Sequence, residues 1–445
     1  MNKQINFLGV ILTIIIIVVF SFMLNYVIEF CYRHSKINVI LISIDTLRAD
    51  HLGCYGYHKN TTPNIDCFSK DSVLFKTAIA QSSSTAPSHG AIFTSLIPSH
   101  NLASRARSQA MPEAITTMAE ILKDNGYRTI SFNGGGQVSA DFGFSAGFEI
   151  YNSSYTNFND KVDSAIAWIS NNKDEKFFIF LHTYEVHHPY TPDKNYLELF
   201  EKDYRGSLPK DISRELLMDI NYKRKKITKE DREHIINTYD AEIYSIDKSF
   251  GLLISYLKKN NLYDNTIIVF TSDHGEEFGE HGWWGWHGHT LYDELLKVPL
   301  IIKFPDSINT SKVVSKMVRS IDILPTLLDF LNIETTNNFE GMSLIKLIDK
   351  KSDIQLYSIS QLDATCLILP IAVRTEEWKL YEGKLFNLRL DSRERYDIAV
   401  KHPDVVKELS EYSNKFMREN RPQTSKTILL KEETIEQLKT LGYLH

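Results

Sequence analysis

Four short runs of almost uninterrupted apolar residues constrain the fold of this chain most. They span 38–44, 177–181, 266–270 and 298–302 and are rich in valine, isoleucine, leucine and phenylalanine. Such runs are typical of strands in a parallel sheet that helices cover on both sides. In a sheet with one solvent-exposed face, apolar and polar residues alternate along each strand. We therefore predict an α/β fold with a mostly parallel sheet and helices on both faces.

The segments between these runs carry a helical periodicity. A long helix is predicted to start near Thr228, because apolar residues recur at spacings of four and three from Tyr239 to Leu257. A second helix is predicted over 113–125, which lies between a proline and a glycine. Both apolar stripes are expected to face the core.

The region after about residue 340 is expected to form a smaller lobe. Short strands are predicted at 371–375, 378–381 and 384–388, and a helix at 403–417. Strands this close together in sequence pair antiparallel, so the lobe is expected to be α+β. The predicted domains are an N-terminal anchor at 1–36, a catalytic domain at 37–340 and a C-terminal subdomain at 341–445.

The N-terminal segment departs from this pattern. No charged residue occurs from Ile5 to Ile28, and Phe7 to Leu24 is almost wholly apolar, which is long enough to cross a hydrocarbon core. A cleaved signal peptide fits poorly, because the apolar region is too long and no small-residue cleavage site follows it. We predict one transmembrane helix, with the rest of the chain on a single side of the membrane. The flanking charges do not decide which side.

Composition excludes several classes of protein. With 43% hydrophobic and 24% charged residues, the chain is neither a polytopic membrane protein nor disordered. A net charge of −6 lacks the excess of basic residues that is typical of proteins that bind nucleic acid, so no nucleic-acid partner is expected. The four cysteines are too few for a disulfide framework, and one bridge, between Cys54 and Cys67, stays open.

Polar side chains follow two of the predicted strands. Asp45 comes directly after the run 38–44, and Asp273 and His274 come shortly after 266–270. Ligands of open α/β sheets bind beyond the carboxyl ends of the strands, where these side chains would meet. A single aspartate in such a place is more often a helix cap or a turn former. Together, two carboxylates and an imidazole predict a divalent-cation site.

A third segment, 82–96, carries a run of serine and threonine before Pro87. The simplest interpretation is a loop that leads into a helix, with Pro87 in its first turn. A hydroxyl held there lies in positive potential near free N–H groups, which suits an anionic substrate group. If Thr85 also contacts the cation, its alcohol can be deprotonated and become a nucleophile.

These segments and several others resemble the signature regions of the sulfatase family, within the alkaline phosphatase superfamily. The segments that carry the resemblance are 45–56, Thr85-Ala86-Pro87-Ser88-His89, Glu185-Val186-His187-His188-Pro189-Tyr190, Ser272-Asp273-His274-Gly275-Glu276, 287–294, 320–326 and Leu441-Gly442-Tyr443-Leu444. The resemblance extends from about Asn38 to the C-terminus and implies a three-layer fold like that of alkaline phosphatase.

The resemblance also implies roles for individual residues. Asp45, Asp273 and His274 match metal ligands, Thr85 takes the place of the nucleophile and is a further metal ligand, His187 matches the histidine near the leaving group, and His287 and His289 match residues that hold the sulfuryl or phosphoryl oxygens. The two late histidines lie among tryptophans and glycines, so a purely structural role for one or both stays open.

Departures from the family pattern affect the expected chemistry. The usual Asp-Asp after the first strand is here Asp45-Thr46, which leaves one metal ligand fewer. His89 replaces an arginine and is predicted to bind substrate, and 133–136 replaces a Gly-Lys-Trp-His segment. Thr85 is not a precursor of formylglycine, so the aldehyde-hydrate route of sulfatases is expected to be closed.

We therefore expect one divalent cation (calcium, manganese, magnesium or zinc) and the cleavage or transfer of an ester group through Thr85, with phosphoesters favoured over sulfoesters. The substrate is expected to be an anionic ester, including lipid-linked or glycan-linked ones, at a site outside the cytoplasm. A membrane-anchored phosphoethanolamine or phosphoglycerol transferase of the cell envelope is one alternative. A catalytically silent, sulfatase-like binding module is the other.

Overall fold

The computed structural model describes most of the chain after the N-terminal segment. The described residues are 15–16, 36–154, 156–305, 312–349, 354–363, 370–419 and 427–444. The predicted anchor, 1–36, therefore lies almost wholly outside the described residues, and none of the helices within those residues is long and apolar enough to cross a membrane. Cys54 and Cys67 are both free thiols, so the bridge between them that the sequence left open is not formed.

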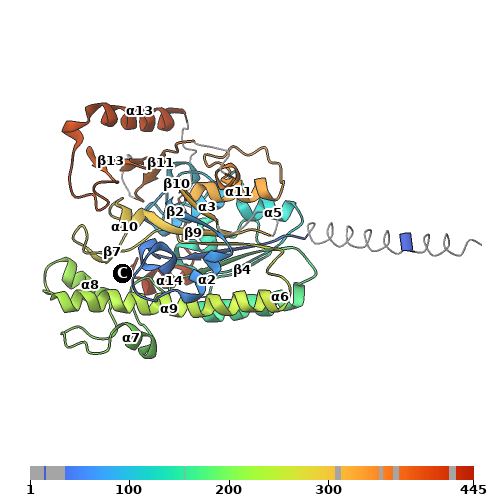
Figure 1. Ribbon diagram of the computed structural model, residues 1–445, viewed down its shortest axis with the longest axis horizontal. Coiled ribbons are helices and arrows are strands. Elements are labelled where there is room, and N and C mark those ends of the chain that lie inside the picture. The colour runs from blue at the N-terminus through green and yellow to red at the C-terminus, as the bar shows by residue number, and fades with distance from the viewer. Residues whose placement is uncertain are drawn as a thin grey trace, which may run out of the picture.

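Eight strands form the central sheet (Figure 1). In spatial order they are β10 (Lys312–Arg319), β2 (Val73–Ile79), β9 (Lys297–Lys303), β6 (Thr266–Thr271), β1 (Asn38–Ile44), β5 (Phe177–Thr183), β3 (Arg128–Phe132) and β4 (Ile150–Asn152). The mostly parallel sheet is confirmed, and all four predicted runs are strands. The run 298–302 differs in direction, because β9 is antiparallel to both β6 and β2. No long crossover helix separates β6 from β9, so the chain returns antiparallel.

Helices cover both faces of this sheet, in three layers (Figure 1). Alternate residues of β1 enter opposite cores: Val39 and Leu41 pack with α3, α5 and α11, whereas Ile40 and Ile42 pack with α2, α6, α8 and α9. The helix bounds are α2 (Pro63–Lys70), α3 (Thr85–Thr94), α4 (Pro98–Asn101), α5 (Met118–Asp124), α6 (Phe158–Asn172), α7 (Lys194–Phe200), α8 (Arg214–Asn221), α9 (Lys229–Lys259), α10 (Asp293–Leu296), α11 (Ile323–Phe330) and α12 (Ile345–Ile348).

Capping residues decide where the two predicted helices begin. Thr228 caps α9 and forms a reciprocal capping box with Asp231, so this helix starts where its sequence predicts. The helix predicted over 113–125 is shorter: α5 starts at Met118, because Thr117 and Glu120 form the same kind of box one turn further along the chain. The proline at 112 is therefore not the start signal.

The C-terminal lobe contains the predicted antiparallel sheet. Its strands are β11 (Ser358–Gln361), β12 (Ile371–Arg374), β13 (Trp378–Tyr381) and β14 (Lys384–Asn387), and α13 (Pro403–Glu419) packs on them. Buried ion pairs join the lobe to α10: Arg374 and Lys379 both contact Asp293, and Lys379 also lies 2.7 Å from Glu394. The lobe is thus fixed to the segment that precedes β9.

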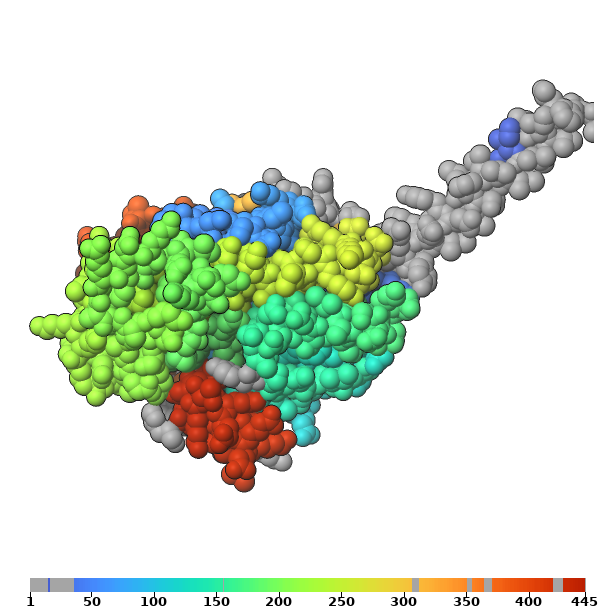
Figure 2. Space-filling model, turned by 90° about the horizontal axis from the view of Figure 1, so that it is seen from below, coloured from blue at the N-terminus to red at the C-terminus, as the bar shows by residue number. Residues whose placement is uncertain are grey.

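The carboxyl ends of the three central strands lie at one edge of the sheet. Ser43 of β1 lies opposite His182 of β5 and Thr271 of β6, so the residues that follow these strands emerge at the same level. The last helix, α14 (Glu432–Thr440), packs near this edge against residues 135–138. Figure 2 shows the red C-terminal segment on the outside of the domain, beside green segments from the first half of the chain.

Candidate active site

The structure brings together the three residues predicted to bind a cation. Asp45 directly follows β1, and Asp273 and His274 follow β6, its neighbour in the sheet. One ligand atom from each of the three lies within 4.8 Å of the other two. All three side chains are fully buried. We call Asp45, Asp273 and His274 the acidic group.

Thr85 lies beside the acidic group, at the first position of α3. Its hydroxyl donates a hydrogen bond to Oδ2 of Asp45 at 3.1 Å and lies 3.4 Å from Nε2 of His274. The helix that it begins is buried along its whole length. Ser88, one turn further along, donates to the backbone oxygen of Asp273 at 2.6 Å, which fixes α3 against the loop after β6.

The acidic group fits a divalent cation. No described residue donates a hydrogen bond to Oδ1 of Asp45 or to Oδ2 of Asp273, although both atoms are buried. Nδ1 of His274 faces the backbone oxygen of Gly275 at 2.9 Å and must carry the ring proton, so its Nε2 has a free lone pair. That nitrogen lies 3.4 Å from Oδ2 of Asp273. Electron-rich atoms gathered in this way need a positive charge, and oxygen and imidazole ligands suit a divalent cation.

Burial and charge perturb the protonation of the two carboxylates in opposite directions. Burial raises the pKa of Asp45 well above its usual value, and the adjacent Asp273 carboxylate raises it further. Burial also acts to raise the pKa of Asp273, but His274 and His89 outweigh it and lower the pKa of this carboxyl. The two adjacent carboxylates therefore resist carrying two negative charges unless a cation is present.

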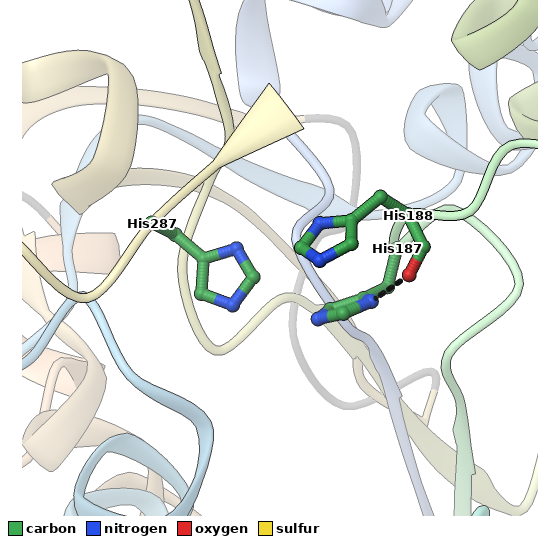
Figure 3. Close-up of side chains that lie close together, drawn as sticks. All are labelled: His187, His188 and His287. Carbon is green, nitrogen blue, oxygen red and sulfur yellow. Dashed lines mark hydrogen bonds between the residues drawn. The ribbon is translucent and has the colours of Figure 1, made fainter. Parts of the chain in front are cut away.

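A second set of side chains, His187, His188 and His287, lies next to the acidic group; we call it the histidine group (Figure 3). His187 and His188 come from the turn after β5, and His287 comes from the loop after β8 (Trp284–Trp286). The ring centroids of His287 and His274 are 4.6 Å apart. The structure thus brings both predicted catalytic histidines, His187 and His287, to the site.

Burial keeps His187 and His287 neutral. It lowers the pKa of His187 well below its usual value, and it lowers that of His287 to about 4 even though the Glu276 carboxylate favours the charged ring. Neither imidazole is therefore a cation near neutral pH.

The two predicted substrate-binding histidines lie outside both groups. His89 is fully buried behind Thr85, with Nδ1 donating to the Thr85 backbone oxygen and Nε2 accepting from Ser43, each at 3.0 Å. Both ring nitrogens of His89 thus have hydrogen-bond partners within the protein. Nε2 of His289 lies 3.2 Å from a carboxylate oxygen of Glu277. The substrate-binding role of both residues stays a prediction.

Two residues at the site were not singled out from the sequence. His182, on β5, places Nε2 3.6 Å from Oδ2 of Asp45, and burial lowers its pKa well below the usual value. Tyr443 places its hydroxyl 2.8 Å from Nε2 of His187 and 2.9 Å from Nε2 of His287. The only signal for Tyr443 was its place in the family-like segment 441–444, and His182 had none beyond its position at a strand end.

Comparison with known proteins identifies the family. Residues 37–333 match the sulfatase family, which covers most of the chain. The chain belongs to the sulfatase family. Residues 279–431 also match the C-terminal region of N-sulphoglucosamine sulphohydrolase. This sulfatase-family protein is therefore an ester hydrolase, and a divalent cation is typical of the family to which it belongs.

Relatives and solved structures agree with this assignment. The chain is 22% identical to an N-acetylglucosamine-6-O-sulfatase of Bacteroides thetaiotaomicron, over 88% of this chain and 89% of the relative. A protein solved with its substrate D-glucosamine-2-N,6-O-disulfate superimposes with a TM-score of 0.72 at 21% identity, over 87% of this chain and 99% of that one. A phosphonate monoester hydrolase of Agrobacterium radiobacter does so with a TM-score of 0.71 at 18% identity, over 89% and 99%.

Proposed function

We propose that this sulfatase-family protein is a cation-dependent phosphoester hydrolase in which Thr85 is the nucleophile. The observation that carries the proposal is the position of the Thr85 hydroxyl, 3.1 Å from Oδ2 of Asp45 and 3.4 Å from Nε2 of His274. A buried alcohol at a helix N-terminus and beside a cation site is activated for attack on an anionic centre. A silent binding module needs no such alcohol.

In the proposed reaction, Oγ1 of Thr85 forms a bond to phosphorus while the bond from phosphorus to the ester oxygen breaks. The hydroxyl proton leaves along the hydrogen bond to Oδ2 of Asp45, and the departing alkoxide takes a proton from water on the side of His187. The hydroxide that this water leaves then attacks phosphorus, the bond from phosphorus to Oγ1 breaks, and the Thr85 oxygen takes its proton back from Asp45, which releases phosphate from a monoester substrate. Two displacements through a covalent intermediate replace one difficult step.

Asp45, Asp273 and His274, with the Thr85 oxygen, are the residues that would hold the cation. When bound, the cation supplies positive charge that favours the Thr85 alkoxide and the oxygens of the transferring group. His287 is assigned to these oxygens and His187 to the departing oxygen. Both rings are oriented by hydrogen bonds from Nδ1, His287 to Glu276 and His187 to the backbone oxygen of His188.

The choice of phosphoesters rests on Thr85. A formylglycine hydrate has a second hydroxyl that expels sulfate from the enzyme, and a threonine has none, so release requires attack by water at the transferred centre. The fold does not decide between the two chemistries, because it is shared by a protein that binds a sulfated sugar and by a phosphonate monoester hydrolase. Because one relative is an N-acetylglucosamine-6-O-sulfatase, glycan-linked esters remain among the candidate substrates.

The ester class is tested by comparing kcat/KM on aryl phosphomonoesters, phosphodiesters, phosphonates and sulfates that share one leaving group. With the leaving group constant, differences report on the transferred centre alone. At least one phosphorus ester is expected to exceed the aryl sulfate by about 100-fold or more, which corresponds to about 2.7 kcal/mol of transition-state stabilisation. Turnover of the sulfate at an equal or higher kcat/KM would contradict the proposed ester class.

A further inference from the structure

The histidine group has the arrangement of a metal site of its own. One ring nitrogen each of His187, His188 and His287 lies within 4.8 Å of the other two (Figure 3). The rings come from two different loops, and Figure 3 shows them facing a common space. His187 and His188 are almost completely buried, and 5% of the His287 side chain is exposed.

Hydrogen bonds determine which nitrogen of two rings is free. Nδ1 of His187 faces the backbone oxygen of His188, which can only accept, so Nδ1 carries the ring proton. Nδ1 of His287 faces the Glu276 carboxylate at 2.9 Å, so it carries the proton as well. Each Nε2 therefore presents a lone pair. A histidine that binds a metal through one nitrogen almost always donates its other N–H to a carboxylate or a backbone carbonyl.

The free nitrogens converge on one atom that cannot satisfy both. Nε2 of His187 lies 2.8 Å from the Tyr443 hydroxyl, and Nε2 of His287 lies 2.9 Å from it. A phenol has a single proton and can donate to only one of the two acceptors. The two free nitrogens are thus short of one donor, and a cation would remove this deficit. The buried Nδ1 of His188 makes no hydrogen bond to a described residue and lies 3.7 Å from a carboxylate oxygen of Glu276.

Close packing of α14 on residues 135 and 136 brings the C-terminal segment to the histidine group. The backbone N–H of Gly136 donates to the side chain of Gln437 on α14 at 2.8 Å. A Cβ at Gly135 would come within 2.1 Å of the Gln437 side chain, and one at Gly136 within 2.7 Å of Leu441. Glycines at these positions therefore let α14 approach closely enough for Tyr443 to reach the histidines.

We propose that His187, His188 and His287 bind a second divalent cation, with the Tyr443 oxygen as a fourth ligand. Three imidazoles favour zinc or a similar transition metal over magnesium or calcium, which prefer oxygen. The catalytic consequence rests on the proposed function: since the rings of His287 and His274 are 4.6 Å apart, the two cations would flank the ester, and the second would stabilise the departing oxygen. His187 and His287 would then act on the substrate through this cation.

The test is the number of cations that the full chain binds. The protein is stripped with a chelator and titrated with Zn²⁺, and bound metal is measured by elemental analysis after gel filtration. Two equivalents are expected for the wild type and one for the double variant His187→Gln/His287→Gln. The matched control His234→Gln, a buried histidine paired with Glu201 elsewhere in the fold, is expected to keep two. One equivalent in the saturated wild type, or two in the double variant, would overturn the inference.

A measurement on the wild type decides the matter if the double variant does not fold. X-ray absorption at the zinc edge is expected to give about two imidazole nitrogens per zinc on average, because the acidic group supplies one and the histidine group three. An average of about one imidazole per zinc would refute the second site. A chain that binds two cations but forms no covalent adduct on Thr85 refutes the proposed function alone, and a chain that forms the adduct with one cation refutes this inference alone.

Discussion

Replacing Thr85 with valine is expected to lower kcat by about 10⁴-fold or more on every ester that the protein hydrolyses. Valine keeps the branched shape of a side chain that is fully buried at the start of α3. It removes the hydroxyl that lies between Asp45 and His274, and with it the atom that attacks the ester. Steady-state rates at saturating cation measure the effect.

Two further variants show whether this loss comes from the hydroxyl. Thr85→Ser retains an alcohol at the same position and is expected to keep activity within about 100-fold of the wild type. Thr94→Val makes the same substitution in the same helix at a buried residue whose hydroxyl donates to the Gly90 backbone oxygen, and it should leave kcat nearly unchanged. If Thr85→Val retained kcat within tenfold, Thr85 would not be the nucleophile.

Changing Asp273 to asparagine is expected to weaken binding of the cation at the acidic group by about 100-fold or more and to lower kcat/KM at least as much. The amide oxygen can still accept the hydrogen bonds that Oδ1 receives from the backbone N–H groups of His274 and Thr46. The amide nitrogen takes the place of Oδ2, so it presents a donor where the cation needs a lone pair. Cation titration of the stripped protein and steady-state kinetics provide the two readouts.

Thermal unfolding separates this effect from damage to the fold. Without a cation, the Asp273→Asn variant should unfold at the same temperature as the stripped wild type or higher, because it no longer holds two adjacent buried carboxylates. Asp247→Asn provides a matched control, since Asp247 is a buried aspartate that accepts hydrogen bonds from Asn64 and Ile65 outside the site. This control should keep its cation affinity. Normal cation binding by Asp273→Asn would remove Asp273 from the ligand set.

The acidic group could be predicted from the sequence because strand ends and chain order locate it. A run such as 38–44 is apolar on both faces, so it must lie inside a covered sheet, and Asp45 then has to emerge at the edge where Asp273 also ends a strand. The direction of each strand in the sheet was harder to predict. Nothing in the composition of 298–302 distinguishes the antiparallel β9 from its parallel neighbours, because burial on both faces gives the same apolar run in either direction.

Tyr443 could not be placed from local patterns. Its position depends on α14 returning to the sheet edge across Gly135 and Gly136, which is a contact between segments about 300 residues apart. The sequence showed only that 133–136 had lost the residues of the family pattern. The structure explains the substitution: the space that side chains would need there is occupied by the C-terminal segment, and this segment brings a phenol to His187 and His287.

Mass mapping of a trapped covalent intermediate tests the role of Thr85 most directly. The full chain is mixed with a phosphorus ester and quenched in acid during turnover, and its peptides are analysed at a mass accuracy that separates phospho from sulfo groups. A phospho group on the peptide that contains Thr85, absent from Thr85→Val, is the expected result. A covalent group on a different side chain, or turnover at the full rate with no adduct on Thr85, would contradict the account.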